Sequence, residues 1–311
     1  RLVKIEQHKT GDEFWDCSID RFHERIRAFV KIEDGCDRFC SYCIIPKSRG
    51  RVRSKPLDTL KNEIEALANG GIREIVLVGI NLSAYGKGED FNIVDAVKIC
   101  NENEKIKRIR LGSLEPDHLT DEVIDGLSSC EKLCPQFHIS LQSGCNKTLK
   151  SMNRHYTAEE YKALCTKLRA SFYDASLTTD VMVGFNDETE ADFSESLDFV
   201  KNIAFEKVHV FPYSERVGTA ASKRGDNVSK QEKEHRAAVM IEETEKIRHN
   251  YLKSLVNTSK KVLFENEIKP GIYQGYTKSY LPVRMKYDRN IVGEELEVKI
   301  TNYCDEFCIA E

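Results

Sequence analysis

Long apolar runs are missing from this sequence of 311 residues. The longest stretch near its centre, residues 75–80, includes Gly79, whereas a membrane helix needs roughly 20 apolar residues. Residues 1–16 mix charges with single apolar residues and contain no apolar segment typical of a secretion signal. No low-complexity tract occurs, and 40% of the residues are hydrophobic, which excludes a disordered chain. We therefore expect a globular cytoplasmic protein with no membrane contact.

An overall excess of positive charge is also missing, because the formal net charge is −4. This argues against a nucleic-acid partner. The charges are unevenly spread, however, since residues 21–55 hold ten Lys and Arg against four Asp and Glu. Such a segment can give an acidic protein one basic face, although a merely solvated basic surface explains it equally well.

Nothing in the sequence indicates a secreted disulfide framework. The eleven cysteines are an odd number in a long chain, and a reducing compartment is the simpler assumption. In that setting thiols are either buried or bind metal.

Strand-length apolar runs alternate with helical patterns through most of the chain. We expect strands at residues 27–32, 74–79, 108–112, 137–141, 177–183 and 207–211. We expect helices near residues 56–68, 93–101, 120–127, 158–171 and 188–202, with caps at Thr157 with Glu160 and at Asp187 with Glu190. This alternation predicts an α/β fold, a partial (βα)6 barrel with its working loops after the C-terminal ends of the strands.

The pattern changes after a long expected helix that starts at Ser229 and ends near Leu255. Short strands are expected at residues 261–268, 281–285, 295–300 and 307–310, separated by turn residues. They predict a small antiparallel β-barrel.

Three cysteines, Cys36, Cys40 and Cys43, form a C-x3-C-x2-C loop directly after the first expected strand. Their thiolates suit a soft metal centre, but structural zinc and ferredoxin-type clusters use four ligands and no fourth Cys or His stands nearby in the sequence. A [4Fe–4S] cluster on three cysteines leaves one iron open for the amino and carboxylate groups of S-adenosylmethionine (SAM). The electron that it passes on yields a 5′-deoxyadenosyl radical. We favour this interpretation over zinc or three unrelated thiols.

The loop resembles that of the radical SAM superfamily, and several other segments are similar to those of its methylthiotransferases. These segments are residues 44–54, 79–82, 138–144, 152–157 and 179–185. The tail is similar to a TRAM domain, notably at residues 275–283. The resemblance implies a linker remnant at residues 1–20, a radical SAM barrel domain at residues 21–250 and a TRAM-like RNA-binding domain at residues 251–311.

Residues 110–116 look most like the branch of the family that acts on N6-threonylcarbamoyladenosine in tRNA. That branch adds a methylthio group to C2 of this adenosine, next to the anticodon. Neighbouring branches act on isopentenyladenosine in tRNA or on a ribosomal protein. The implied partners are tRNA and an electron donor such as flavodoxin or ferredoxin. The alternative of another class is a non-catalytic, zinc-containing RNA-binding protein.

The resemblance also assigns residues to the cofactors. Cys36, Cys40 and Cys43 would bind the reducing cluster. The residues expected to contact the methionine or ribose part of SAM are Gly79, Asn81, Ser113, Glu115, Ser140, Gln142 and Asp180. The alternative is that these polar residues merely satisfy backbone groups at strand ends.

Basic and aromatic side chains are the candidates for RNA contact. Residues 47–55 alternate basic with other residues, and in an extended chain Arg49, Arg51 and Arg53 would share one side and meet phosphates. A solvated edge strand is the alternative. In the tail, Tyr273, Tyr276 and Tyr280 are the residues that would stack bases.

One departure from the family concerns its auxiliary cluster. Family members carry three further cysteines in an N-terminal domain, at a site associated with the inserted sulfur, but only Cys17 precedes Cys36. A second, auxiliary [4Fe–4S] cluster is therefore expected only in a longer chain. The chain as given is expected to cleave SAM without completing sulfur insertion.

Overall fold

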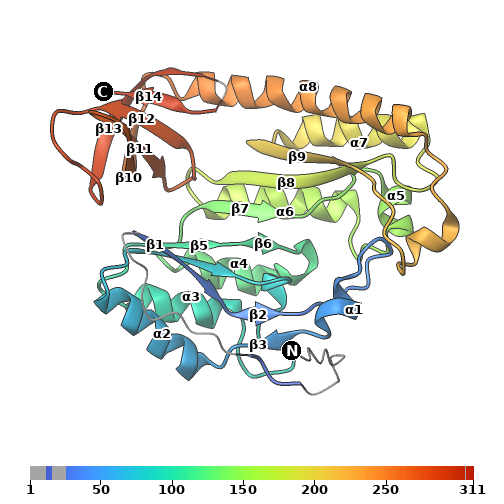
Figure 1. The fold of residues 1–311 in the computed structure, drawn as a ribbon, viewed down its shortest axis with the longest axis horizontal. Coiled ribbons are helices and arrows are strands. Elements are labelled where there is room, and N and C mark those ends of the chain that lie inside the picture. The colour runs from blue at the N-terminus through green and yellow to red at the C-terminus, as the bar shows by residue number, and fades with distance from the viewer. Residues whose placement is uncertain (1–11, 16–25, 305) are drawn as a thin grey trace, which may run out of the picture.

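The computed structural model describes residues 12–15, 26–304 and 306–311. Most of the expected linker at residues 1–20, including Cys17, lies outside the described residues. Figure 1 shows an open barrel of parallel strands with a smaller β-barrel at one end. Among the described residues, no helix combines the length and apolarity needed to cross a membrane.

Two parallel sheets together form the partial barrel. The first has the strand order β1 (Arg27–Lys31), β4 (Glu74–Val78) and β5 (Arg108–Leu111). The second has the order β6 (Ser113–Leu114), β7 (Gln136–Ile139), β8 (Ser176–Val183) and β9 (Lys207–Pro212). The sheets adjoin at Gly112, because β5 pairs with β4 whereas β6 pairs with β7. The third expected strand, residues 108–112, corresponds to β5, and the short β6 follows it as an additional strand. The predicted six-unit α/β barrel is confirmed.

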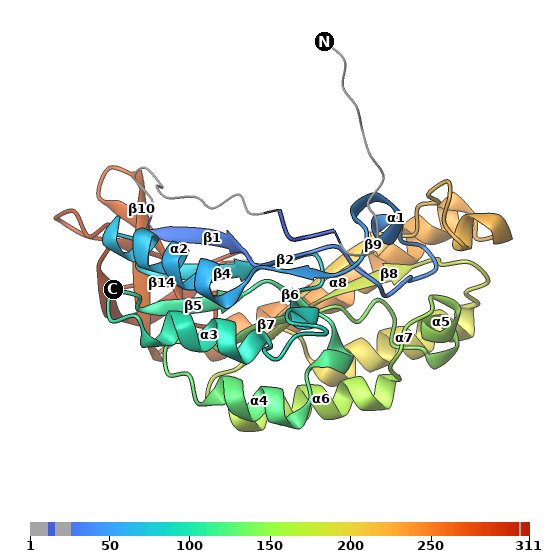
Figure 2. The same ribbon diagram turned by 90° about the horizontal axis from the view of Figure 1, so that it is seen from below.

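Helices cover the outer face of the strands (Figure 2). They are α2 (Leu57–Asn69), α3 (Ile93–Glu102), α4 (Asp121–Ser128), α6 (Ala158–Ser171) and α7 (Glu190–Ile203), and α8 (Lys230–Ser254) runs along β9. The expected capping box of Thr157 with Glu160 is present. The expected cap at Asp187 is wrong: α7 starts two residues later, where Thr189 and Asp192 form the capping box.

The tail is a closed five-stranded barrel. Its strands are β10 (Ser259–Lys269), β11 (Ile272–Thr277), β12 (Pro282–Lys286), β13 (Glu295–Tyr303) and β14 (Cys308–Ala310). The expected small β-barrel is confirmed, with four antiparallel pairings and one parallel pairing, that of β12 with β14. Strand β11 was not predicted, because it contains Gly275, which resembles a break in a strand. The glycine allows the backbones of β10 and β11 to lie close together, since a side chain there would strike the backbone at Leu263.

A buried charge network joins the tail to the N-terminal ends of β1, β4 and β5. Glu74 is fully buried and forms ion pairs with Arg27, with Arg108 at 3.9 Å and with Arg110 at 2.9 Å. The two latter arginines also donate to tail carbonyls at 2.8 Å, Arg108 to Tyr276 and Arg110 to Lys278. The tail is therefore fixed at the end of the barrel away from the C-terminal strand ends.

This interface contains two of the three tyrosines that were expected to stack RNA bases. Tyr276 and Tyr280 stack on each other at 4.8 Å, and the guanidinium of Arg110 lies 4.7 Å from the Tyr280 ring centre. Tyr273 is buried in the core of the tail. Tyr273 is therefore not free to stack on a base, whereas Tyr276 is half-buried and Tyr280 is 39% exposed, so a role of these two rings in RNA contact stays a prediction.

Candidate active site

The three cysteines lie in a loop at the C-terminal end of β1. The loop starts after β2 (Glu33–Asp34) and continues into α1 (Ile45–Arg49) and β3 (Arg53–Ser54), which pairs with β2. It is closed by a hydrogen bond from the Cys36 backbone N–H to the Gly50 carbonyl at 3.0 Å. All three thiols are free and half-buried. The position matches the predicted working face of the barrel.

Burial keeps two of these thiols neutral in the absence of a metal. It raises the pKa of Cys36 to about 12 and also raises the pKa of Cys43. Within the described residues, no three His, Cys, Asp or Glu side chains lie close enough together to bind a single ion. A [4Fe–4S] cluster differs from such a single-ion site, because each thiolate binds a different iron.

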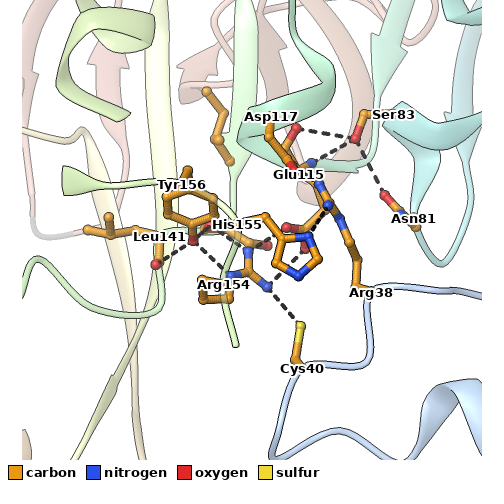
Figure 3. Close-up of polar contacts among 12 residues, drawn as sticks. Arg38, Cys40, Asn81, Ser83, Glu115, Asp117, Leu141, Arg154, His155 and Tyr156 are labelled. Atoms are coloured by element: carbon orange, nitrogen blue, oxygen red, sulfur yellow. Dashed lines mark hydrogen bonds and ion pairs between the residues drawn. The ribbon is translucent and has the colours of Figure 1, made fainter. Parts of the chain in front are cut away.

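Arg154 connects the cysteine loop to the end of β6 (Figure 3). Its Nη1 donates hydrogen bonds to the Sγ of Cys40 and to Oε1 of Glu115, both at 3.3 Å. Its Nη2 forms an ion pair with the same carboxylate and donates to the Ser140 carbonyl at 3.2 Å. The Arg154 side chain is 3% exposed, so these are charge-assisted contacts in a largely desolvated site.

Ser83 joins Asn81 to this network. The Ser83 hydroxyl accepts a hydrogen bond from the Glu115 backbone N–H at 2.8 Å and lies 3.5 Å from Oδ1 of Asn81. Tyr156 holds the chain after β7, because its hydroxyl hydrogen-bonds to the carbonyls of Ser140 and Leu141 at 2.8 and 2.7 Å. Of the residues expected to contact SAM, the structure therefore connects Asn81, Glu115 and Ser140 to Cys40.

The other expected SAM residues lie outside this network. Asp180 pairs with His138, with 3.2 Å between Oδ2 and Nε2, and its carbonyl accepts from the Gln142 backbone N–H at 2.8 Å. Ser113 is exposed on β6. Gly79 directly follows β4 and lies against the side chain of Glu33. These four positions keep their proposed role on the resemblance alone.

The expected row of basic residues does not form. Residues 45–49 are helical, so the chain after the cysteines is not extended, and Lys55 is buried against Glu63. Arg49 and Arg51 are exposed, and the guanidinium of Arg51 lies 4.8 Å from the centre of the Phe39 ring. The Arg53 side chain is 9% exposed and lies 3.6 Å from Asp34, so its charge is paired within the chain. The expectation that the three arginines share one side required an extended chain, and this condition is not met at residues 45–49.

Sequence reasoning gave no role to four residues of the site, Glu33, Ser83, Arg154 and Tyr156. Arg154 and Tyr156 belong to a segment that resembles the family, and this was the only signal for them. Glu33 is a carboxylate at the end of an apolar strand, three residues before Cys36. That position alone did not separate it from an exposed glutamate.

Comparisons with known proteins agree with this geometry. Residues 30–200, more than half of the chain, match the radical SAM superfamily. The chain is 36% identical over 290 residues to threonylcarbamoyladenosine tRNA methylthiotransferase MtaB of Thermotoga maritima, covering 93% of this chain and 66% of that protein. It is 37% identical over 303 residues to tRNA-2-methylthio-N(6)-dimethylallyladenosine synthase of Clostridium botulinum. This match covers 96% of this chain and 67% of that protein. The chain belongs to the radical SAM methylthiotransferase family.

Solved structures support the radical SAM fold at low sequence identity. Coproporphyrinogen III oxidase (HemN) of Escherichia coli superposes with a TM-score of 0.54 and 15% identity, covering 84% of this chain and 68% of that chain. The methyltransferase TsrM of Kitasatospora setae superposes with a TM-score of 0.50 and 16% identity. This match covers 59% of this chain and 36% of that chain. The chain spans about two thirds of the length of the curated methylthiotransferases that it matches.

Membership of the radical SAM superfamily implies a [4Fe–4S] cluster and SAM, and the residues present fit both groups. Three soft thiols in one loop are the donor set for a cluster with one open iron. Next to them, the buried Oε1 of Glu33 and Nδ2 of Asn81 have no hydrogen-bond partner among the described residues. An acceptor and a donor left open at one site suit a polar ligand.

Proposed function

We propose that this chain is the SAM-cleaving and substrate-binding part of a tRNA methylthiotransferase that acts on N6-threonylcarbamoyladenosine. The product carries a methylthio group on C2 of this adenosine, next to the anticodon. The observation that supports the proposal is the similarity to MtaB over 93% of the chain, together with the cysteine loop at the working end of the barrel. Residues 110–116 support this branch over the dimethylallyladenosine branch, to whose members the chain is similarly identical.

The chain's own residues hold and orient the reactants. Cys36, Cys40 and Cys43 would bind the [4Fe–4S] cluster, which when bound supplies the electron that cleaves SAM. Arg154 fixes Cys40 and the Glu115 carboxylate relative to each other. Asn81, Glu115 and the Ser140 carbonyl would then meet polar groups of SAM at the strand ends.

Several further parts of the proposal concern the longer protein and its setting. The auxiliary cluster that provides sulfur is assigned to a longer chain, and an electron donor such as flavodoxin or ferredoxin reduces the first cluster. The barrel domain covers residues 21–250 and the TRAM-like domain residues 251–311. The protein acts on tRNA in the cytoplasm.

Anaerobic incubation of the full-length protein with SAM, reductant and defined tRNAs tests the proposal. We expect a methylthio mass gain on nucleosides from tRNA that carries threonylcarbamoyladenosine, and none on the same tRNA without that group. Cys40→Ala is the matched inactive variant. A gain on dimethylallyladenosine instead would reassign the branch. A gain on ribosomes alone would contradict the tRNA substrate.

A further inference from the structure

A cavity lies at the junction of the barrel and the tail, away from the cysteine loop. Its volume is about 580 Å³, a size that suits a small ligand. The start of β9 and the strands β11 and β12 line it, together with the C-terminal half of α8, which runs from the barrel to the tail (Figure 1). No residue of the candidate active site lines this junction cavity, so it is a separate feature of the molecule.

Charged side chains of both signs line the junction cavity. They are three cations and two carboxylates, Lys207, Arg248, Arg284, Glu245 and Glu306. Nη1 of Arg248 lies 3.6 Å from Oε1 of Glu206, so this charge is balanced within the chain. Lys207 is exposed at the first position of β9, and its ammonium forms no hydrogen bond or ion pair with any residue that the structure describes. The ammonium of Lys207 therefore favours an anionic group in the cavity.

Arg284 contributes a flat and fixed guanidinium to the same cavity. One face of this group lies on the ring of Phe307, with 3.7 Å between the guanidinium carbon and the ring centre. Nε of Arg284 donates a hydrogen bond to Oε1 of Gln274 at 2.8 Å, which holds the plane in place. Phe307 and Gln274 line the cavity as well. A guanidinium plane supported by an aromatic ring is a surface on which a planar base stacks.

We propose that the junction cavity binds one nucleoside monophosphate unit, with its phosphate at Lys207 and its base stacked on Arg284. The exposed carboxylates of Glu245 and Glu306 are acceptors for ribose hydroxyls or base amino groups. A free nucleotide and one nucleotide of an RNA strand share this chemistry. This binding needs neither the cluster nor SAM and goes beyond the proposed function.

Three probes separate the phosphate contact from the base contact: guanosine, 5′-GMP and the pentaribonucleotide GUCGU. Guanine is used because SAM carries adenine, so these probes report on a different site. Equilibrium dialysis measures their binding to the wild-type protein, Lys207→Gln and Arg284→Lys. We expect Lys207→Gln to raise the Kd for GMP about tenfold, the loss of one charged hydrogen bond, and to leave that for guanosine within about twofold. Arg284→Lys keeps the charge but loses the plane, so it should raise both Kd values about tenfold.

The pentaribonucleotide identifies the source of the bound unit. A Kd about tenfold or more below that for GMP, with the same response to both substitutions, assigns the cavity to an RNA strand, because a strand brings further phosphates. A Kd equal to or above that for GMP assigns the cavity to a free nucleotide. Both results support the site.

Lys162→Gln, an exposed lysine of α6, is the matched control and should leave every Kd unchanged. Thermal unfolding of each variant checks that it is folded. Failure of all three probes to bind would overturn the inference, and so would unchanged Kd values in both Lys207→Gln and Arg284→Lys. An equal loss of GMP and guanosine in Lys207→Gln would contradict the phosphate contact. A protein that binds GMP in this way but modifies no tRNA would defeat the proposed function and leave this inference standing.

Discussion

The guanidinium of Arg154 donates a hydrogen bond to the Sγ of Cys40 across 114 residues of sequence. The same side chain is held by Glu115 and by the Ser140 carbonyl, so its position is fixed from two strand ends. A cation and a hydrogen bond at a cysteine sulfur stabilise added negative charge there. This contact therefore connects the barrel wall to the redox properties of the bound cluster.

Removal of that contact should make the cluster harder to reduce. For Arg154→Leu we expect a midpoint potential lower by roughly 60 mV, a tenfold change in a one-electron equilibrium. A redox titration followed by electron paramagnetic resonance measures it. Arg169→Leu on α6, away from the cysteines, is the control, and an equal shift in both variants would contradict a specific role for Arg154.

Cys40→Ala should abolish formation of 5′-deoxyadenosine from SAM. The variant leaves the cluster with two of its three expected thiolates, so iron and sulfide content should also fall after reconstitution. Chromatography of the reaction products measures the loss. Cys165→Ala, a buried cysteine of α6, should retain cluster loading, and undiminished SAM cleavage by Cys40→Ala would refute the assignment.

The stability of the metal-free protein should depend on pH through Glu33. Burial raises the pKa of Glu33 from 4.5 to about 8 in the folded protein, so folding favours the protonated form. The contribution of Glu33 to stability is therefore complete below pH 4.5 and is lost as the pH rises towards 8. Relative to Glu33→Gln, the wild-type free energy of unfolding should fall by about 3 kcal/mol between pH 5 and pH 8.

Urea unfolding at several pH values measures this difference. Glu65→Gln, on the exposed face of α2, should follow the wild type at every pH. Parallel pH profiles for wild type and Glu33→Gln would show that the carboxyl titrates normally.

Glu74→Gln should destabilise the protein strongly. The substitution removes the carboxylate that pairs with Arg27, Arg108 and Arg110 and leaves their charges uncompensated at a buried interface. Breaking a buried ion pair from one side costs about 4 kcal/mol. Urea unfolding should show this loss, and a loss below about 1 kcal/mol would mean that the network contributes little to holding the tail.

The salt dependence of tRNA binding should separate the three arginines near the cysteine loop. Arg49 and Arg51 are exposed, so Arg49→Gln with Arg51→Gln should lower the slope of log K against log salt by roughly two, about one per lost phosphate contact. Arg53→Gln should leave it unchanged, because that side chain is directed to Asp34. Lys61→Gln with Lys162→Gln, on the outer helices, is the matched control. Equal slopes for all variants would assign Arg49 and Arg51 to a solvated surface.

The parts of the fold that sequence predicted well depend on local pattern. Strand β4 is an apolar run after its first residue, and the cap of α6 lies within four residues of sequence. The division at Gly112 and the parallel pairing of β12 with β14 depend on neighbours that are distant in the chain, and no local pattern encodes them.

In the candidate active site, too, local patterns could be predicted from the sequence and contacts between distant residues could not. The cysteine spacing is local and identified the loop. The pairing of Arg154 with Cys40 joins residues 114 positions apart, and that of Glu33 with Asn81 joins residues 48 apart. A buried carboxylate and an exposed one have the same letter in the sequence. Only the packing of β2 against the end of β4 distinguishes them.

The anchoring of the tail through Glu74 has a geometric consequence for any large substrate. The loop between β2 and α1, which holds the cysteines, and the tail lie at opposite ends of the barrel (Figure 1). A molecule held by both must be elongated and must lie along the full length of the strands. The length of the strands therefore sets the distance between the two ends, and a short molecule cannot reach both at once.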